Sequence, residues 1–498
     1  MEEELKQSSR RGFIGAMTAL TAASYNRILG ANDRVGIGFI GYGLIGKQHV
    51  ADFKMYPDVD ILGLCDVYKP RVTEGLGFIG NPNCKGYSDF RKMYEDKNIH
   101  GIVNSTPDHW HALASIMACA AGKDVYVEKP LTVSIDEGKW MLQARDKYKR
   151  VVVVGTQRNH NPGHQAAKKV FESGVLGKIQ AVKLGTSGRN VYPGFGKTPI
   201  ENPPPEIDYD MWLGPAPKKP YQNHRALYHF RWFWDYSGGQ LTNLGAHSVS
   251  AFLLVTGVKG PTRVVSFGGR VALEDDGETP DLQECLYQFP NFMMTMGIRE
   301  ANSYRESTGS VVLGTKGNLQ LGGGNIVTEV HGDPVNQIPR FLGHPIGGPV
   351  YNNTPNVPWI EGAPTSAQAQ AAGGGRGGGG ARGGAAAPAA GAARGTGGAG
   401  GGRGSAPAGF PGEAAMYANE RDFVECIRSR NKPFCDLELG HRTAIICNLG
   451  NMSLRLGGRA IQWDPEKEVV IGDKEAAAMC TPRYRAPWDA VLKSIVKV

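Results

Sequence analysis

Apolar and polar positions between residues 34 and 156 alternate in a way that predicts short strands separated by helices. Five apolar runs read as strands: 35–40, 59–65, 99–105, 124–127 and 151–154. Runs of this length, bounded by turn residues, are typical of strands buried on both faces of a parallel sheet. A helix is predicted from residue 106 to 121, between the third and fourth strands. The alternation predicts an α/β fold with a doubly wound parallel sheet.

The pattern changes after residue 156, where longer alternating runs replace the short buried ones. Strands are expected at 179–185, 263–271, 282–289 and 292–298, and a hairpin at 311–321. Helices are expected at 413–430 and 440–456, and the glycine turn at Gly238–Gly239 predicts one further helix that carries Asn243 and His247. The pattern predicts a second α/β domain with a mostly antiparallel open sheet.

Composition divides the chain further. Residues 363 to 408 are almost entirely Gly, Ala, Arg and Pro, and cannot bury enough surface to offset their ordering entropy. We predict five segments: an N-terminal segment 1–33, a cofactor domain 34–155, the first part of a substrate domain 156–362, a flexible insertion 363–411, and the completion of the substrate domain with a tail, 412–498.

Net charge and cysteine usage exclude several functions. The formal net charge is +8, but four arginines lie in the Gly/Ala tract, which leaves +4 on the rest with no concentrated basic patch. We therefore expect no nucleic-acid partner. The eight cysteines are scattered and none forms C-x-x-C, so neither a zinc site nor a disulfide framework is indicated, and no metal is expected. No apolar run reaches the roughly 18 residues of a membrane span.

Three glycines follow the first predicted strand in the spacing G-x-G-x-x-G. Gly41 allows a tight strand-to-helix turn, Gly43 leaves room for a pyrophosphate, and Gly46 lets the next helix pack closely on the sheet. Asp66 follows the second strand, twenty residues after Gly46. A carboxylate there accepts a hydrogen bond from a ribose 2′-hydroxyl. The alternative is a plain glycine turn with a solvated aspartate, but the order of the elements favours a dinucleotide site. Its expected turn contacts are Gly41, Tyr42, Gly43, Leu44, Ile45 and Gly46.

Further motifs join this one in the order found in a known family. The chain resembles the glucose–fructose oxidoreductase / inositol dehydrogenase family (Gfo/Idh/MocA) from about residue 34 to 488, the Gly/Ala tract excepted. The most specific match is Glu128-Lys129-Pro130 after a predicted strand. The other matching residues are Gly41 to Gly46, Thr106-Pro107 with His109 and His111, Gly238-Gly239 with Gly245-Ala246-His247, Gly440-His441-Arg442, and Trp463-Asp464-Pro465. The resemblance implies a Rossmann domain, a second domain whose open sheet forms an oligomer interface, and oxidation or reduction of a sugar or polyol hydroxyl with NAD or NADP.

Hydride transfer from a carbinol needs a base for the hydroxyl proton, and Lys129 and His247 are the candidates. A lysine beside an oxidised nicotinamide is expected to have a lowered pKa. The family pattern places an aspartate and a histidine four residues apart on one helix, and here the pair is Asn243 and His247. Asn243 can orient a hydroxyl but cannot accept a proton. An exposed strand-end lysine and a structural histidine remain the alternatives.

The remaining predicted contacts divide into cofactor and substrate groups. Asp66 favours NAD because its carboxylate would repel a 2′-phosphate, although Lys69 and Arg71 nearby keep NADP open. The expected cofactor contacts besides the turn are Asp66, Thr106, Pro107, His109, His111, Glu128 and Lys129. For a sugar pocket, where aromatic faces stack and charged groups bind hydroxyls, the candidates are Arg158, His164, Arg231, Trp234 and Asp235.

An N-terminal motif adds an expectation about location. Ser9-Arg10-Arg11-Gly12-Phe13-Ile14, followed by a weakly apolar stretch, is similar to a twin-arginine export signal, and predicts an exported, periplasmic protein. Outside the cytoplasm a dissociating dinucleotide would be lost, so we expect it to be retained. We predict an NAD(P)-dependent sugar or polyol oxidoreductase that forms a homo-oligomer. The alternatives are a redox-neutral glycoside hydrolase or lyase, and a non-catalytic sugar-binding protein, which Asn243 would suit.

Overall fold

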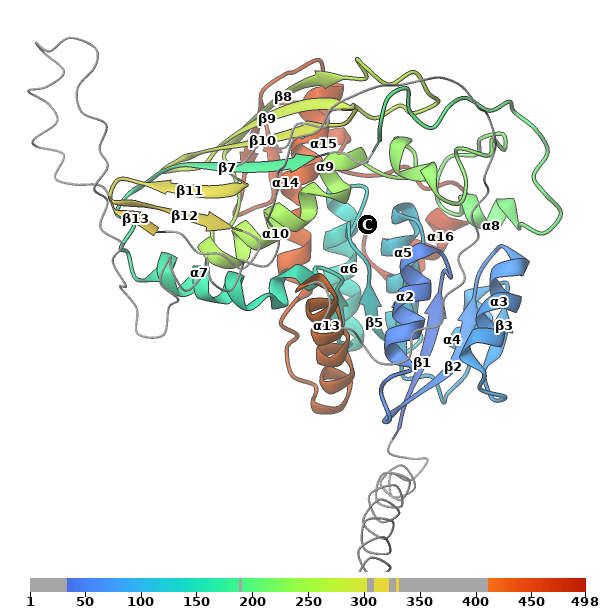
Figure 1. Cartoon of the computed structure of the whole chain (residues 1–498). Coiled ribbons are helices and arrows are strands. Elements are labelled where there is room, and N and C mark those ends of the chain that lie inside the picture. The colour runs from blue at the N-terminus through green and yellow to red at the C-terminus, as the bar shows by residue number, and fades with distance from the viewer. Residues whose placement is uncertain (1–33, 188–189, 302–308, 322–327, 331–410) are drawn as a thin grey trace, which may run out of the picture.

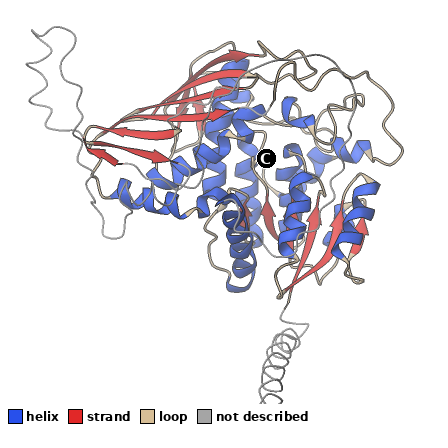
Figure 2. Ribbon diagram, in the orientation of Figure 1, coloured by secondary structure: helices blue, strands red, loops and turns tan. Residues whose placement is uncertain are grey.

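The fold is described from a computed structural model that covers residues 34–187, 190–301, 309–321, 328–330 and 411–498. The predicted export signal lies outside these residues, as does the predicted insertion apart from its last position. Two sheets with helices between and around them make up the described chain (Figures 1 and 2).

The first sheet has six parallel strands in the order β3-β2-β1-β4-β5-β6, the Rossmann arrangement. Its strands are β1 (Val35–Ile40), β2 (Val59–Cys65), β3 (Lys85–Tyr87), β4 (Gly101–Asn104), β5 (Asp124–Val127) and β6 (Val152–Val154). Every residue of β1, β4, β5 and β6 is buried, as expected for strands covered on both faces. Only β3 was not predicted, because three residues, two of them exposed, leave no apolar pattern to detect.

Helices cover both faces of this sheet and define two separate apolar cores. They are α2 (Leu44–Phe53), α3 (Lys69–Ile79), α4 (Phe90–Tyr94), α5 (Asp108–Ala120) and α6 (Ile135–Tyr148). Local sequence helps to determine where α6 begins, because the Glu137 carboxylate reaches back to accept the backbone amides of Ser134 and Val133, each at 3.0 Å. The predicted doubly wound α/β fold is confirmed.

The second sheet has nine strands in the order β13-β12-β11-β7-β10-β9-β8-β14-β15. All neighbours are antiparallel except β7 and β10, so the sheet is mostly antiparallel, as predicted. The strands are β7 (Ile179–Ser187), β8 (Arg263–Gly269), β9 (Leu282–Gln288), β10 (Met293–Arg299), β11 (Ser310–Gly314), β12 (Gly317–Leu321), β13 (Thr328–Val330), β14 (Ile461–Asp464) and β15 (Val469–Ile471).

One face of this second sheet packs on helices and the other is exposed. Residues of β9 alternate strictly between buried and exposed positions, which is the signature of a half-covered strand. The covering helices are α7 (Pro162–Glu172), α9 (Gly239–Asn243), α10 (Gly245–Thr256) and α14 (Leu437–Arg455). The single helix predicted to carry Asn243 and His247 is interrupted at Leu244, so Asn243 ends α9 and His247 lies in α10.

Helix α13 (Pro411–Ser429) makes a contact between the two predicted domains that the sequence did not indicate. Residues 412–498 were assigned to the substrate domain, yet α13 packs on the first sheet. Phe423 and Val424 are fully buried in the core that contains Ile37 and Phe39 of β1. The chain therefore crosses to the second domain and returns to complete the first one. The remaining short elements are η2 (Gln157–His160), α8 (Tyr209–Leu213), η3 (His229–Trp232), α15 (Lys474–Ala478) and α16 (Trp488–Ile495).

Within the described residues, no helix combines the length and the apolar character needed to cross a bilayer.

The first glycine turn gives a direct test of this packing. A Cβ added to Gly46 would lie 2.0 Å from the carbonyl oxygen of Gly41, so a side chain forces turn and helix apart. We expect Gly46→Ala to lower the free energy of unfolding by about 1–3 kcal/mol, measured by urea denaturation. Gly77→Ala is the matched control, because Gly77 lies within α3 and a Cβ added there would have no neighbouring atom within 4 Å. It should be neutral or stabilising by up to about 1 kcal/mol. Equal effects of the two substitutions would contradict the close approach.

Candidate active site

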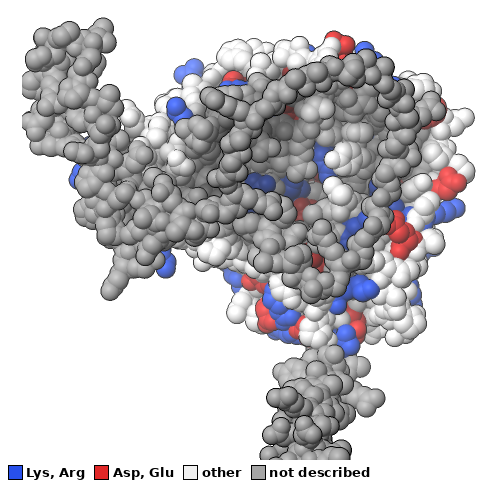
Figure 3. All heavy atoms as spheres, in the orientation of Figure 1, with Lys and Arg blue, Asp and Glu red and all other residues white. Residues whose placement is uncertain are grey.

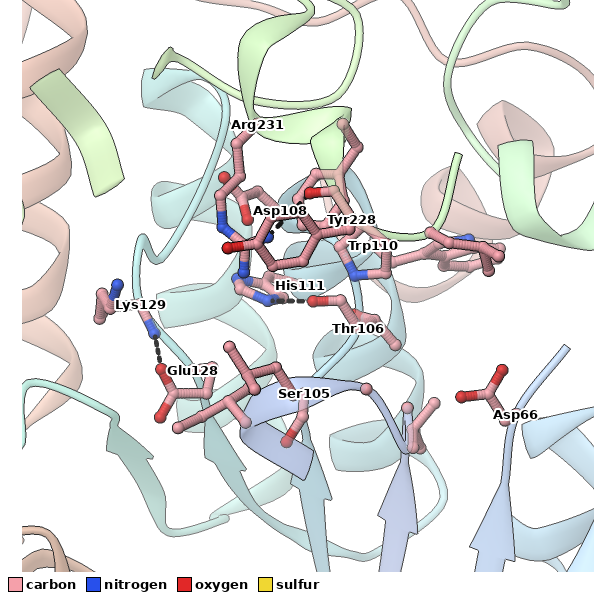
Figure 4. Close-up of a pocket in the computed structure, with 18 of the residues that line it drawn as sticks. Asp66, Ser105, Thr106, Asp108, Trp110, His111, Glu128, Lys129, Tyr228 and Arg231 are labelled. Carbon is pink, nitrogen blue, oxygen red and sulfur yellow. Dashed lines mark hydrogen bonds between the residues drawn. The ribbon is translucent and has the colours of Figure 1, made fainter. Parts of the chain in front are cut away.

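A cavity of about 440 Å³ opens at the carboxyl ends of the first sheet's strands, where open α/β sheets bind their ligands. The residues that follow β1, β2, β4 and β5 line one side, and segments of the second domain line the other. Figure 3 shows a hollowed face with Lys and Arg atoms inside the hollow, and Figure 4 shows the lining side chains. Asp66 and Lys129 lie at opposite ends of the cavity (Figure 4).

The glycine turn forms the floor of the cavity between these two ends. Gly41 has φ +87°, and a Cβ there would lie 2.6 Å from the Ser105 carbonyl oxygen. A Cβ added to Gly43 would meet only the Arg71 guanidinium within 4 Å, at 3.7 Å, so the cavity side of Gly43 stays open. Helix α2 begins directly after it, with no side chain capping its N-terminus. Backbone amides and open space for an anion therefore occur together, which fits the pyrophosphate of a dinucleotide. Gly41, Gly43, Leu44 and Ile45 line the cavity, whereas Gly46 serves packing.

Asp66 is fixed at the far end of the cavity. Its Oδ2 accepts the Tyr42 amide at 2.7 Å and its Oδ1 accepts the Tyr68 amide at 2.9 Å. Burial raises the pKa of this carboxyl group, against the opposing effects of Arg71 and the two amides. Each oxygen keeps a lone pair for a ribose hydroxyl. Tyr42 contributes this amide, but its side chain is buried and does not line the cavity.

The segment after β4 delivers Thr106, Pro107 and His111 to the cavity but not His109. The ring nitrogens of His111 face the carbonyl oxygens of Pro130, at 2.7 Å, and of Thr106, at 2.9 Å, which joins two lining segments. His109 points away, and its Nε2 donates to the Trp212 carbonyl at 2.9 Å. Burial lowers the pKa of His109 to about 4. The prediction that His109 contacts the cofactor is therefore corrected: successive side chains on a helix point about 100° apart, so His109 and His111 cannot share one direction.

Lys129 lies at the other end, half-buried, where the two domains meet. Its Nζ donates to Asn243 Oδ1 at 3.0 Å and to the Asn243 carbonyl at 3.2 Å. Asn243 and His247 both line the cavity although the helix breaks between them. The structure thus brings all three predicted catalytic residues together. It places a neutral amide, not a carboxylate, directly against the ammonium group.

Glu128 lines the cavity, and its buried carboxylate also contacts a buried histidine. His49 of α2 lies between Glu128 Oε1, at 3.0 Å, and Glu420 Oε1 of α13, at 2.5 Å. Burial favours neutral imidazole, but the two carboxylates outweigh it and raise the pKa of His49 to about 10. Burial would raise the pKa of Glu128, and His49 holds it lowered. One imidazolium cannot offset two carboxylates, so burial leaves the pKa of Glu420 raised to about 7.

Two of the five predicted substrate residues reach the cavity: Arg158 of η2 and Arg231 of η3. The Arg231 guanidinium lies over the Phe230 and Tyr228 rings, 4.6 and 5.4 Å from their centroids. These two arginines therefore present positive charge to the substrate end of the cavity, next to an aromatic surface.

The other three predicted substrate residues, His164, Trp234 and Asp235, lie outside the cavity lining, so these predictions are corrected. His164 is buried and its Nδ1 donates to the Arg158 carbonyl at 2.8 Å. The Trp234 ring lies against the Arg455 guanidinium, 5.1 Å away, and Asp235 pairs with Lys219 at 3.6 Å. The aromatic stretch does contribute to the site, but its 3₁₀ turn and the loop after it decide which side chains face inward.

Several lining residues were missed by the sequence reasoning. Tyr228 and Leu227 precede the aromatic stretch, while Met211 and Trp212 come from the short helix α8. Trp212 belongs to a small, largely aromatic core formed by residues between 207 and 236, and Leu227 packs against this core. Its only sequence signal was a concentration of aromatic residues without strand or helix periodicity. Arg71 was named only in connection with NADP, and it lines the cavity beside Asp66.

Among the described residues, no group of three or more His, Cys, Asp or Glu side chains is arranged to hold a metal ion.

Comparison with known proteins agrees with this geometry. The family description "Oxidoreductase family, NAD-binding Rossmann fold" matches residues 35–156, and "Oxidoreductase family, C-terminal alpha/beta domain" matches 161–266 and 410–490. Together they account for more than half of the chain. The chain belongs to the Gfo/Idh/MocA oxidoreductase family. Its first domain is the family's NAD-binding domain, as the glycine turn and Asp66 predicted.

Individual relatives of this Gfo/Idh/MocA protein match over part of their length. Inositol 2-dehydrogenase of Salmonella paratyphi B is 28% identical over 35% of this chain and 53% of its own. Levoglucosan dehydrogenase of Pseudarthrobacter phenanthrenivorans is 31% identical over 29% and 39%. A glycosyl hydrolase family 109 protein of Shewanella pealeana is 27% identical over 30% and 34%. The chain thus matches about half or less of the length of these curated relatives.

A solved structure covers more of the chain and supports the fold. The WlbA dehydrogenase from Bordetella pertussis, in complex with NADH and UDP-GlcNAcA, is similar with a TM-score of 0.56 and 17% identity. The similarity covers 86% of this chain and 99% of that one.

The two buried histidines predict opposite titration behaviour. His49, between two carboxylates, should carry both ring protons at pH 8, whereas His109 should be neutral at pH 6. Nitrogen-15 NMR of the imidazole rings measures both.

Because the pKa of His49 is raised in the folded state, its contribution to stability is complete below about pH 6.5 and is lost as pH rises toward 10. Glu420→Gln should lower the pKa of His49 by about one pH unit or more. A His49 that titrates near pH 6.5 would contradict the bridge.

Proposed function

We propose that this protein transfers hydride between NAD and a hydroxyl-bearing carbon of a sugar or polyol. The observation that carries the proposal is the position of Lys129, which lies in the same cavity as the glycine turn and Asp66 but at the opposite end. A dinucleotide that places its adenosine at Asp66 and its pyrophosphate at Gly43 extends toward Lys129. The residues at that end are the ones that a reacting carbinol would meet.

The chain's own residues can perform the proton chemistry. When bound, NAD supplies the hydride chemistry that no side chain can provide. Lys129 in its neutral form would take the hydroxyl proton during oxidation and return it during reduction. His247, which lines the same end, is the second candidate for this role. Asn243 orients Lys129 through its oxygen and cannot itself hold the proton.

A carbohydrate substrate is supported by the opposite wall. Arg158, Arg231 and Tyr228 offer guanidinium and phenol groups for hydroxyl recognition beside apolar ring faces. The named inositol and levoglucosan dehydrogenases among the relatives act on compounds of this class. Asp66 supports NAD over NADP, although Arg71 beside it could contact a 2′-phosphate.

A redox-neutral glycoside hydrolase or lyase is the second candidate function, favoured by the similarity to the glycosyl hydrolase family 109 protein. In such a cycle a sugar hydroxyl would be oxidised to a ketone with its hydride passing to NAD, and a base would remove the acidified neighbouring proton as the glycosidic substituent leaves with a proton. In a hydrolase, water would then add to the resulting double bond before the hydride returns to the ketone. Export by the twin-arginine route, proposed from Ser9 to Ile14, would suit a cofactor that is loaded in the cytoplasm and regenerated in every cycle. Coupled oxidation of one sugar and reduction of another would also regenerate the bound cofactor in every cycle.

The first experiment identifies the cofactor that the purified protein carries and then adds glycosides or polyols without free NAD. We expect bound dinucleotide by absorbance and after denaturation. Lys129→Ala should retain it but lose turnover by roughly 10²-fold or more, since general acid–base groups contribute about 10²–10⁴. Lys139→Ala is the matched control, because Lys139 pairs with Asp136 outside the cavity.

The outcomes separate the candidates. Cleavage of a glycoside without net reduction supports the redox-neutral cycle, and stoichiometric consumption of added NAD supports an ordinary dehydrogenase. A protein that is isolated empty contradicts cofactor retention and weakens the export proposal. Full turnover in Lys129→Ala contradicts the role of this lysine, while absence of any turnover with cofactor bound favours a non-catalytic sugar-binding protein.

We also propose a homo-oligomer formed through the exposed face of the second sheet. Phe267, Leu282, Leu286 and Met293 project from β8, β9 and β10, and Phe267 is 62% exposed. These apolar side chains share one exposed sheet face with the Glu284–Arg299 ion pair, and exposed apolar groups rimmed by charge are typical of an interface.

Sedimentation tests the oligomer directly. Phe267→Asp should shift the protein toward monomer, because it places a charge in the centre of the proposed contact. Phe78→Asp is the control, since Phe78 is also exposed but lies on α3 of the first domain. An unchanged sedimentation coefficient for Phe267→Asp would contradict this interface.

A further inference from the structure

A chain of side-chain hydrogen bonds leads from Lys129 into the second domain. Lys129 Nζ donates to Asn243 Oδ1 at 3.0 Å, and Asn243 Nδ2 donates to Gln240 Oε1 at 3.0 Å. Gln240 Nε2 then donates to Glu300 Oε1 at 2.8 Å. Asn243, Gln240 and Glu300 are each at most 5% exposed, so water cannot substitute for a missing partner without rearrangement. Glu300 directly follows strand β10, far from the motifs that identify the site.

The chemistry of its two ends fixes the direction of this chain. An ammonium group only donates, so the Asn243 oxygen must face Lys129 and its NH₂ must face Gln240. At the other end, Glu300 Oε2 accepts the Trp232 indole N–H at 2.9 Å, and Oε1 accepts the backbone N–H of Asn190 at 3.3 Å. Both of these groups only donate, so the Glu300 oxygens act as acceptors and Gln240 must turn its NH₂ toward them. The Gln240 oxygen is therefore left facing residue 243.

We propose that Glu300 is a positioning residue that sets the direction of the Gln240–Asn243 amide chain, so that the site requires an amide and disfavours a carboxylate at position 243. An aspartate there would place its second oxygen against the Gln240 oxygen, two acceptors with no proton between them. The amide at position 243 therefore matches its hydrogen-bond partners. It does not indicate that a catalytic set of lysine, aspartate and histidine has been lost. The inference rests on the proposed function only where it concerns the proton chemistry of Lys129.

The consequence for Lys129 is electrostatic. A carboxylate at position 243 would favour the charged ammonium form, whereas the amide holds the side chain in place without adding negative charge. We therefore expect Asn243→Asp to make removal of the Lys129 proton harder. The tests leave unchanged the other titratable groups that line the cavity, which are Cys65, Asp66, Arg71, Asp108, His111, Glu128, Arg158, Tyr228, Arg231 and His247.

A stability cycle tests the direction of the chain without any substrate. Asn243→Asp, Glu300→Gln and the double variant are compared by thermal unfolding. In Glu300→Gln we expect the new side chain to keep its oxygen toward the Trp232 indole, the shorter contact at 2.9 Å, and to give up the weaker one with the Asn190 backbone amide at 3.3 Å. Its NH₂ then faces Gln240, which reverses and presents its own NH₂ to residue 243. An aspartate is then the matching partner. We expect the change in Tm that Asn243→Asp causes to be more favourable by about 3 °C or more in the Glu300→Gln background than in the wild type.

Two further variants separate the hydrogen-bond chain from simple charge repulsion between positions 243 and 300. Gln240→Leu breaks the chain but keeps both charges, so the coupling should disappear in that background; coupling that persists would overturn the proposal. Glu172→Gln is the matched Glu-to-Gln control and should show no coupling, because Glu172 is exposed on α7 and pairs only weakly with Lys168, at 3.9 Å. If a single variant fails to fold, recovery of folded protein in the double variant also shows the expected coupling. If the double variant fails to fold as well, the proposed reversal of the Gln240 amide is contradicted.

Activity gives the second readout. The pH profile of kcat/KM for oxidation should move to higher pH by about one unit or more in Asn243→Asp, since the carboxylate stabilises protonated Lys129. NADH binding, measured by fluorescence, should be unchanged. Additive effects on Tm in the cycle would overturn the role of Glu300 whatever the activity. A wild-type protein without any oxidoreductase activity would overturn the proposed function while the stability cycle still decides the direction of the chain.

Discussion

The buried contact of His49 with Glu128 and Glu420 is the interaction on which the rest of the structure most depends. It joins three segments that are remote in sequence: the helix after the glycine turn, the loop after β5, and helix α13 near the end of the chain. Removing one partner would leave a charge buried without compensation, which is far more costly than losing an exposed pair. The contact therefore couples the closing of the first domain to the placement of Lys129.

Helix α13 strengthens this coupling with contacts around the same sheet. Asn419 donates to the Tyr126 hydroxyl of β5 and to the Val154 carbonyl of β6, each at 3.1 Å. Arg421 bonds both oxygens of Asp58, next to the start of β2. The chain passes through the whole second domain before it returns here. The core of the cofactor domain is therefore completed by a helix that follows most of the substrate domain in the sequence. This contact ties the two domains, and with them the two walls of the cavity, to each other.

The sequence predicted the framework of the site better than its lining. The glycine turn, Asp66 and Lys129 follow directly from the ends of strands, and strand ends are identified by short apolar runs. His109, His164, Trp234 and Asp235 were placed by proximity to motifs, and the direction of each side chain depended on helix phase or on a 3₁₀ turn that no pattern revealed. Tyr228 was missed because the segment that carries it has no periodicity.

By itself, the sequence determined the doubly wound parallel sheet, the position of the dinucleotide turn and the identity of the lysine at its far end. These features depend on local patterns: buried apolar runs, glycine spacing and the polar residues that end each strand. The tertiary structure alone decided that α13 packs on the first sheet, that His49 bridges two carboxylates, and that Glu300 turns an amide toward Lys129. Each of these depends on segments that lie far apart in the sequence, whose buried polar groups must find partners that the local sequence does not specify.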